Sequence, residues 1–265
     1  MRKEAAVSNV KSLAGKVAIV TGGGKGIGRA IVEALADAGA DVAIVGRQTR
    51  PLEEAAEAVE SRGGRGRAYP LDLRKVAEIR ELVPKVVSDL GDLDILVNNA
   101  GVQLLDNAED VNEEDFDQTI DVNLKAPFFC SQEAARYWIG KGRGGKIVNI
   151  TSIWAEVGFP TFSAYCASKG GLLLMTRAFT SEWAKYGINV NAVGPTLIVT
   201  DMTRALAEDE AFRSVYMRKL PPGRFGMPHE VAAAVVFLAG PGSDFVHGQQ
   251  LMVDGGYTAI GHLPD

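Results

Sequence analysis

The sequence predicts an α/β protein in which helices cover both faces of one parallel β-sheet. Along most of its 265 residues, short runs of aliphatic residues alternate with longer stretches whose apolar residues have helical spacing. The short runs are continuously apolar, which is typical of parallel strands buried on both sides. Because no internal repeat or linker interrupts this alternation, we expect a single domain.

Each short apolar run bounded by glycine or polar residues is predicted as a strand. Together they give a doubly wound sheet of about seven strands. The strands are expected at 17–21, 42–46, 67–71, 95–98, 146–151, 188–193 and 250–253.

The helices are predicted from apolar spacing and from their first residues. Ile27, Ile31 and Leu35 recur at helical intervals after a run of glycines. Pro51 stands at the start of the second helix, where proline is favoured. The stretch 112–140 is either one long helix or a broken pair. Helices are expected at 26–39, 51–61, 76–90, 112–140, 163–186 and 230–239.

Two segments fall outside this alternation. Residues 1–14 are polar and lack the apolar core of a secretory signal, so we expect a flexible lead-in before a domain spanning 15–265. Residues 195–224 are amphipathic, charged and bounded by prolines. They suit either a mobile lid over a site or an ordinary surface excursion.

Composition limits the classes of function. The net charge of −5 argues against a nucleic-acid partner. Cys130 and Cys166 form no CxxC pair, which argues against a disulfide framework and for a reducing cytoplasm. No apolar run reaches membrane-spanning length, and the histidines show no metal-binding spacing. We therefore expect a cytoplasmic protein with no metal and no nucleic-acid or membrane partner.

A nucleotide site is predicted where the first strand ends. Thr21 runs directly into a glycine-rich turn that precedes a helix. In this arrangement the backbone N–H groups and the helix dipole face an anion, and glycine allows a pyrophosphate to approach closely. The candidate cofactor-binding residues of the turn are Gly22, Gly24, Lys25, Gly26, Ile27 and Gly28.

The end of the second strand indicates which nucleotide binds. An NAD site places an acidic residue there, but Asp41 lies at the opposite end of this strand. Arg47 stands at the expected end and can pair with a 2′-phosphate, with Lys25 as a second cation. NADP(H) is therefore favoured and NAD(H) remains possible, since Arg47 could instead be solvated or stack on adenine in either cofactor.

Tyr165 and Lys169 stand four residues apart within a predicted helix, and so share one face. The lysine charge favours the phenolate, so we expect the pKa of Tyr165 to be lowered toward neutrality. A tyrosine tuned in this way exchanges a proton with a substrate hydroxyl or carbonyl.

In combination, the motifs resemble the short-chain dehydrogenase/reductase family from about Leu13 to Tyr257. The matches are TGGGKGIG at 21–28, Asn98-Asn99-Ala100-Gly101, Asn123 in DVN, Ser152 in ITS, Tyr165 with Lys169, and Val253-Asp254-Gly255-Gly256. The resemblance implies a single-domain Rossmann fold that binds a nicotinamide cofactor and interconverts a secondary alcohol and a ketone.

The resemblance also implies a catalytic tetrad. Tyr165 would donate the proton in reduction, and Lys169 would hold the nicotinamide ribose and depress the pKa of Tyr165. Ser152 would hydrogen-bond the substrate oxygen, and Asn123 would hold a water that relays protons to Lys169. Further implied cofactor contacts are Asp72, Leu73, Asn99, Gly101, Ile198 and Thr200.

Within the family, the chain resembles gluconate 5-dehydrogenase-like members. Those members commonly carry two arginines after the Asn-Asn-Ala-Gly motif, whereas this chain has Leu104 and Leu105. Two leucines cannot neutralise a carboxylate, so a polyol or ketone stands beside a sugar acid as the expected substrate. Glu156 either binds substrate hydroxyls or is a solvated loop residue.

Two other functions remain open. A 3-oxoacyl-[acyl-carrier-protein] reductase shares the tetrad and needs a basic surface for an acidic carrier, for which Arg136, Lys141 and Arg143 are candidates. An NADP-sensing protein would keep the fold without the chemistry, although it has no need of the Tyr165/Lys169 pair. The family resemblance further implies a homotetramer that packs through the long helices at 112–140 and 163–186.

Overall fold

The sheet of the computed structural model, which describes residues 11–201 and 203–260, has seven strands in the order β3-β2-β1-β4-β5-β6-β7. Every neighbouring pair of strands is parallel. The strands are β1 (Val17–Thr21), β2 (Asp41–Gly46), β3 (Gly66–Pro70), β4 (Ile95–Asn98), β5 (Gly145–Ile150), β6 (Ile188–Pro195) and β7 (Gln250–Val253). The predicted doubly wound parallel sheet is confirmed.

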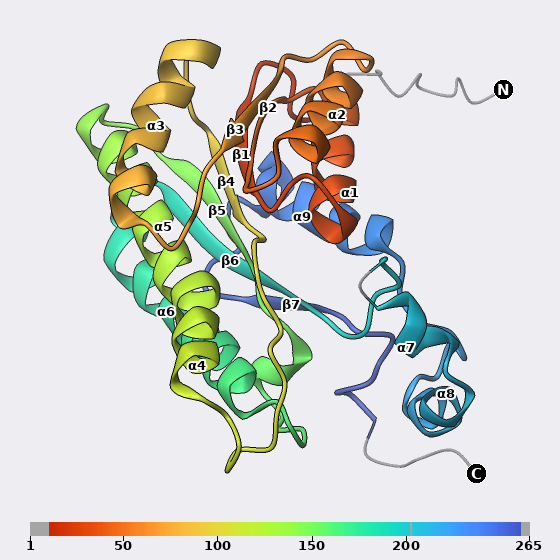
Figure 1. The fold of residues 1–265 in the computed structure, drawn as a ribbon. Coiled ribbons are helices and arrows are strands. Elements are labelled where there is room, and N and C mark those ends of the chain that lie inside the picture. The colour runs from red at the N-terminus through yellow and green to blue at the C-terminus, as the bar shows by residue number, and fades with distance from the viewer. Residues whose placement is uncertain (1–10, 202, 261–265) are drawn as a thin grey trace, which may run out of the picture.

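Helices cover both faces of this sheet (Figure 1). One face carries α1, α2 and α9, and the other carries α3, α5 and α6. The helices are α1 (Gly26–Asp37), α2 (Thr49–Glu60), α3 (Val76–Leu90), α4 (Glu113–Ile120), α5 (Ala126–Gly140), α6 (Ser163–Trp183), α7 (Arg204–Glu208), α8 (Glu210–Tyr216) and α9 (Pro228–Ala239).

The alternation of side chains along β1 explains the two layers. Ala18 and Val20 belong to the core beneath α1 and α9, whereas Val17 and Ile19 belong to the core beneath α3 and α5. Successive residues of a strand point to opposite faces, so a strand covered on both sides must be apolar throughout.

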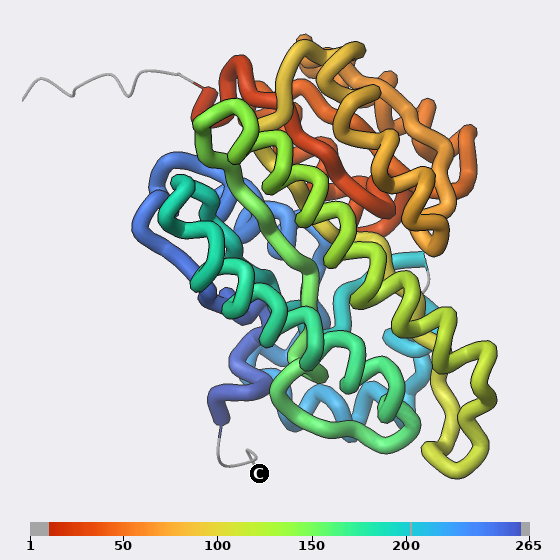
Figure 2. The backbone as a smooth tube through the Cα atoms, turned by 90° about the vertical axis from the view of Figure 1, so that its left-hand side faces the viewer, coloured from red at the N-terminus to blue at the C-terminus, as the bar shows by residue number. Residues whose placement is uncertain are grey.

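The stretch predicted as one long helix or a broken pair is continuous but irregular. A π-helical turn, Asp121–Lys125, joins α4 to α5. Figure 2 shows α4 and α5 as one long rod with α6 alongside. Asn112 begins the rod, because its side-chain oxygen accepts the backbone N–H of Asp115 at 2.9 Å.

The two segments expected outside the alternation differ in outcome. The lead-in prediction falls mostly on residues 1–10, which lie outside the described residues. Leu13, by contrast, is buried and donates its N–H to the Ala38 carbonyl at 2.8 Å, so flexibility does not extend to it. The segment 195–224 contains the short helices α7 and α8, which lie beside the carboxyl end of the sheet (Figure 1).

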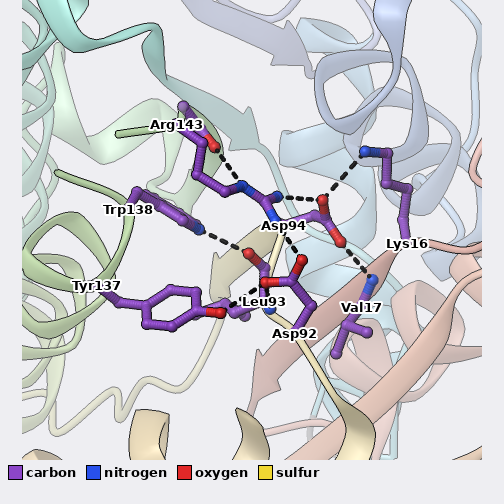
Figure 3. A network of polar contacts seen from close by, with 9 residues as sticks. Lys16, Val17, Asp92, Leu93, Asp94, Tyr137, Trp138 and Arg143 are labelled. Atoms are coloured by element: carbon purple, nitrogen blue, oxygen red, sulfur yellow. Dashed lines mark hydrogen bonds and ion pairs between the residues drawn. The ribbon is translucent and has the colours of Figure 1, made fainter. Parts of the chain in front are cut away.

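A polar cluster closes the opposite, amino-terminal edge of the sheet (Figure 3). The Arg143 guanidinium contacts both Asp92 and Asp94. Asp94 also accepts the backbone N–H of Val17 at 3.0 Å, while Trp138 donates to the Leu93 carbonyl at 2.7 Å. The cluster thus joins the start of β1, the loop before β4 and the end of α5.

Replacing Arg143 with Met leaves Asp92 and Asp94 without their shared cation. Because the Asp94 side chain is only 10% exposed, we expect a loss of on the order of 2 kcal/mol in the free energy of unfolding, measured by urea denaturation. Arg136→Met is the matched control, since its ion pair with Glu133 lies on a helix surface and is worth less than about 0.5 kcal/mol. Equal losses in both variants would contradict the assigned role of the cluster.

Candidate active site

The site is built at the carboxyl ends of β1 and β4, where the strand order reverses direction. Beyond β1, Gly22 and Gly26 have φ angles of +67° and +54°, a region that favours glycine. A Cβ on Gly28 would collide with the Gly22 carbonyl. The turn therefore needs its glycines to bring the backbone tightly over the start of α1.

Side chains from the two strand ends lock this turn. Asn99 donates its side-chain amide to the carbonyls of Thr21 at 2.8 Å and Gly22 at 3.3 Å. The Thr21 hydroxyl in return accepts the N–H groups of Asn99 and Ala100, each at 3.0 Å. The turn is thus preorganised at the amino terminus of α1, and its geometry fits a dinucleotide pyrophosphate.

The residues proposed to surround the adenosine part lie at the ends of β2 and β3. Arg47 is exposed just beyond β2. Leu73 is buried, while Asp72 is held by Arg74 at 2.8 Å. The Arg74 hydrogen bond lowers the pKa of Asp72 to about 2, and the charge of nearby Arg47 acts in the same direction.

Thr200 and Ile198 approach the glycine turn from the far end of β6. A Cβ on Gly26 would lie 3.3 Å from the Thr200 methyl group, so Thr200 covers the turn. Ile198 is buried and bridges to Gly226. The Thr203 hydroxyl holds this loop by donating to the Ile198 carbonyl at 2.5 Å and accepting the Thr200 N–H at 2.9 Å.

The four tetrad residues come together beside this cradle. Tyr165 and Lys169 share one face of α6, with the lysine ammonium 5.6 Å from the centre of the tyrosine ring. The buried ammonium donates to the Ile150 carbonyl at 2.9 Å, at the end of β5. Ser152 follows two residues later, and its side chain is near enough to the Tyr165 phenol to act on the pKa of that group. The strand end and the helix face thus bring these groups together.

Asn123 enters the site from the π-helical turn. Its side-chain oxygen accepts the Val102 N–H at 2.8 Å, and its amide donates to the Val102 carbonyl at 2.9 Å and to the Ser168 hydroxyl at 3.1 Å. A Cβ on Gly101 would lie 3.5 Å from the Lys169 ammonium and 3.4 Å from the Asn123 oxygen. Gly101 therefore marks the place where these two side chains meet.

The predicted direction of the Tyr165 pKa is wrong for the chain itself. Burial raises the pKa of Tyr165 to about 12, and the hydrogen bond from Ser152 opposes this only in part. Burial also lowers the pKa of Lys169 to about 8. The sequence argument weighed the lysine charge and left out desolvation, which is the largest cause of the shift here.

An aromatic cluster forms the wall beyond Ser152 and Tyr165. Trp154 packs against Phe159, Phe162 and Tyr257, with ring centres 4.6, 5.5 and 5.7 Å away. Phe162 meets Tyr165 edge to face at 5.9 Å. From its place next to the catalytic serine, the sequence predicts that Trp154 either walls the pocket or packs in the core, whereas Phe162 and Tyr257 were not predicted. The available signal was the density of aromatic residues between the catalytic serine and tyrosine.

Other residues predicted near the substrate are more exposed than most of the tetrad. Glu156 is exposed on the loop after Ser152. Leu104 is half-buried and Leu105 exposed.

In residues 11–201 and 203–260, no group of three His, Cys, Asp or Glu side chains is placed to hold a metal ion. Over the same residues, no helix is both long enough and apolar enough to cross a bilayer.

The basic residues considered for a carrier protein lie at the wrong edge of the sheet. Arg143 belongs to the amino-terminal cluster of Figure 3, and Lys141 ends α5 next to it. Arg136 pairs with Glu133 on the same helix. The tetrad is at the carboxyl edge, so these cations do not surround its entrance.

Comparison with known proteins agrees with the geometry. A family model described as enoyl-(acyl carrier protein) reductase matches residues 22–258. The chain is 41% identical to 2-dehydro-3-deoxy-D-gluconate 5-dehydrogenase of Escherichia coli K12, over 94% of this chain and 97% of that protein. It is 40% identical to an NAD-dependent glycerol dehydrogenase of Listeria innocua, over 92% and 94%.

A solved structure extends this likeness to three dimensions. A gluconate 5-dehydrogenase from Burkholderia cenocepacia J2315, in complex with NADP and tartrate, superposes with a TM-score of 0.90 at 36% identity and covers 95% of this chain and 98% of that one. The fold, the ordered motifs and these likenesses together define a Rossmann-type protein. The chain belongs to the short-chain dehydrogenase/reductase family.

Replacing Lys169 with Met is expected to stabilise the protein at neutral pH. The pKa of Lys169 is about 8 in the folded state and 10.5 as a free side chain, so the buried ammonium costs stability below pH 8. This cost diminishes as the pH rises and disappears above the unfolded value. At pH 7 we expect a gain of on the order of 2 kcal/mol in the free energy of unfolding, reduced by the loss of the Ile150 hydrogen bond.

Urea denaturation at pH 7 and at pH 10.5 measures this difference. Lys185→Met, at an exposed position after α6, provides the control for removal of a surface charge. A Lys169→Met protein that is no more stable than wild type at pH 7 would contradict the burial cost.

Proposed function

We propose that the protein is an NADP(H)-dependent oxidoreductase that interconverts a secondary alcohol and a ketone on a sugar acid or a polyol. One observation carries this proposal: Tyr165, Lys169 and Ser152 meet beside the glycine turn, at the carboxyl edge of the sheet. The likeness to sugar-acid dehydrogenases supports the sugar acid, and the glycerol dehydrogenase keeps a polyol in view.

The tetrad residues divide the proton chemistry among them. In reduction, the Tyr165 phenol donates a proton to the substrate oxygen, and its pKa of about 12 keeps it protonated until that moment. The Ser152 hydroxyl binds the same oxygen and stabilises charge that develops on it. A bound nicotinamide supplies or accepts the hydride.

Lys169 and Asn123 support the proton transfer from Tyr165 without contacting the substrate oxygen. The Lys169 ammonium favours negative charge on the phenol as the proton leaves, and it holds the ribose hydroxyls of the cofactor. The Asn123 side chain is engaged with Val102 and Ser168, so its role is to fix the backbone beside Lys169. A water relaying protons to Lys169 is then held by the backbone of the π-helical turn.

The remaining features support further parts of the proposal. We assign residues 195–224 as the lid, since Tyr216 of α8 reaches the Thr196 hydroxyl at 2.8 Å and packs on Tyr257. Exposed Phe128 and Leu174 on α5 and α6 support a homotetramer that packs through these helices. The free cysteines Cys130 and Cys166 are consistent with a reducing cytoplasm.

A matrix of cofactors and substrates tests the function. We expect turnover, followed by the absorbance of reduced nicotinamide, with gluconate or its 5-keto partner, or with neutral polyols, and more slowly with an acetoacetyl thioester. Tyr165→Phe should abolish turnover while leaving NADP(H) affinity unchanged, because only the proton is lost. Activity retained in Tyr165→Phe would refute the proton-transfer role. Activity with the thioester alone would favour the acyl-carrier reductase, and bound cofactor without turnover would favour the sensor.

Cofactor choice depends on Arg47. Replacing Arg47 with Asp removes the partner of a 2′-phosphate and adds an acceptor for a ribose hydroxyl, so the preference should move toward NAD(H) by at least about tenfold in kcat/KM. Arg50→Asp, which changes an exposed ion pair on α2, is the control. An unchanged cofactor ratio in Arg47→Asp would exclude Arg47 from the cofactor site.

A further inference from the structure

The loop before α6 contains a backbone conformation that is unfavourable for the residue adopting it. Thr161 has a φ of +67°, and among residues 11–201 and 203–260 it is the only residue other than glycine with a positive φ. A β-branched side chain crowds the backbone in this left-handed region, so such a residue persists only where its surroundings hold it. The contacts around Thr161 therefore indicate what this conformation does for the protein.

The contacts that hold the turn are made by the Thr161 backbone and by the residue that follows. The Thr161 side chain is exposed, whereas its carbonyl accepts the backbone N–H of Asp106 at 3.2 Å, which ties the loop to the segment after β4. Phe162 is only 9% exposed, and its ring packs on Trp154 and Phe159 with ring centres 5.5 and 5.3 Å apart. The left-handed turn thus places the Phe162 ring in the aromatic cluster and not in solvent.

Helix α6 begins at the same turn. Phe162 immediately precedes the helix, and its carbonyl accepts the Cys166 N–H at 2.7 Å, but its side chain provides no hydrogen-bonding cap. Tyr165 is the third residue of α6, so its position depends on where the helix starts and in which direction. The Phe162 ring also contacts the Tyr165 ring edge to face at 5.9 Å. The residue that begins the helix therefore touches the proposed proton donor as well.

We propose that Thr161 and Phe162 position Tyr165 for proton transfer: the left-handed turn at Thr161 directs the Phe162 ring onto the Tyr165 ring, and this contact sets the direction of the phenol. The inference rests on the proposed function, in which Tyr165 gives and takes the proton. Both residues act through Tyr165, since the Thr161 side chain is exposed and that of Phe162 has no polar group.

Backbone variants of Thr161 test the turn by steady-state kinetics, with NADP(H) and the substrate of the matrix that turns over fastest. Thr161→Pro excludes a positive φ, because the proline ring fixes φ at about −65°. We expect kcat to fall by about tenfold or more while KM for the cofactor is unchanged, since the phenol is misplaced and the glycine turn is not. Thr161→Asn should keep the wild-type kcat, because asparagine tolerates the left-handed region. Thr161→Val, which loses only the hydroxyl, is the matched control and should also keep it.

Phe162→Leu tests the ring contact without changing the backbone. Leucine keeps an apolar side chain at this position but has no ring edge to pack on Tyr165, so kcat should again fall by about tenfold with an unchanged KM for the cofactor. Phe159→Leu is the matched control, because Phe159 packs on Trp154 and Phe162 in the same cluster and is one residue removed from Tyr165. Equal kcat in Phe162→Leu and Phe159→Leu would overturn the positioning role.

A titration of Tyr165 tests the positioning role without turnover. Burial raises the pKa of Tyr165 to about 12, so turning the Phe162 ring away admits water and should move this pKa down toward its ordinary value of 10.0. Subtracting the spectrum of the same protein with Tyr165→Phe isolates its phenolate absorbance. Up to pH 10.5 this absorbance should be absent in wild type and present in Thr161→Pro and Phe162→Leu. The groups that face the phenol, Ser152, Cys166 and Lys169, are the same in all three proteins.

The two readouts distinguish failure of the inference from failure of the proposed function. Wild-type kcat and no phenolate absorbance in both Thr161→Pro and Phe162→Leu would overturn the positioning role in an enzyme that still turns over its substrate. A lowered Tyr165 pKa in both variants, in a protein without turnover, would support the positioning of Tyr165 and refute the oxidoreductase function. Where Thr161→Pro loses the native circular dichroism spectrum, Phe162→Leu against Phe159→Leu decides the outcome by the same two measurements.

Discussion

One buried positive charge organises the site. The Lys169 ammonium is almost fully enclosed, and its hydrogen-bond partner is the carbonyl that ends β5. Removing an ammonium from water is costly, so the surrounding structure must hold it in place rather than let it escape to solvent. The Tyr165 ring centre lies 5.6 Å from this ammonium, and the backbone of Gly101 passes close beside it.

The charged groups at the amino-terminal ends of the strands differ in role from those at the carboxyl ends. At the amino-terminal edge, the charges of Asp92, Asp94 and Arg143 are paired with one another. At the carboxyl edge, the Lys169 ammonium forms no ion pair with a carboxylate of the described residues, and it donates to the Ile150 carbonyl instead. Parallel strands make this division possible, because all their carboxyl ends meet at one edge. The ion pairs of this cluster thus lie away from the site, whereas the buried Lys169 lies within it.

Local patterns were enough to predict much of this arrangement. The strands and the glycine turn were predictable because apolar runs and positive φ angles are properties of neighbouring residues. The aromatic wall was not, since Trp154 and Tyr257 are about a hundred residues apart and meet only through packing. The direction of the Tyr165 pKa shift was predicted wrongly for the same reason. The i,i+4 spacing shows that a lysine is near, but it does not show that the tyrosine is buried. The π-helical turn was also hidden, because 112–140 keeps its helical spacing on both sides.

The π-helical turn makes the orientation of α4 depend on the number of residues in it. Each residue of an α-helix advances the direction of its side chains by about 100°, so loss of the extra residue in Asp121–Lys125 would rotate all of α4 relative to α5 by that angle. Asn123 would no longer face Val102, although no residue in the site had been substituted. Insertions and deletions in this turn therefore differ from ordinary surface length variation, because they change which face of α4 meets the site.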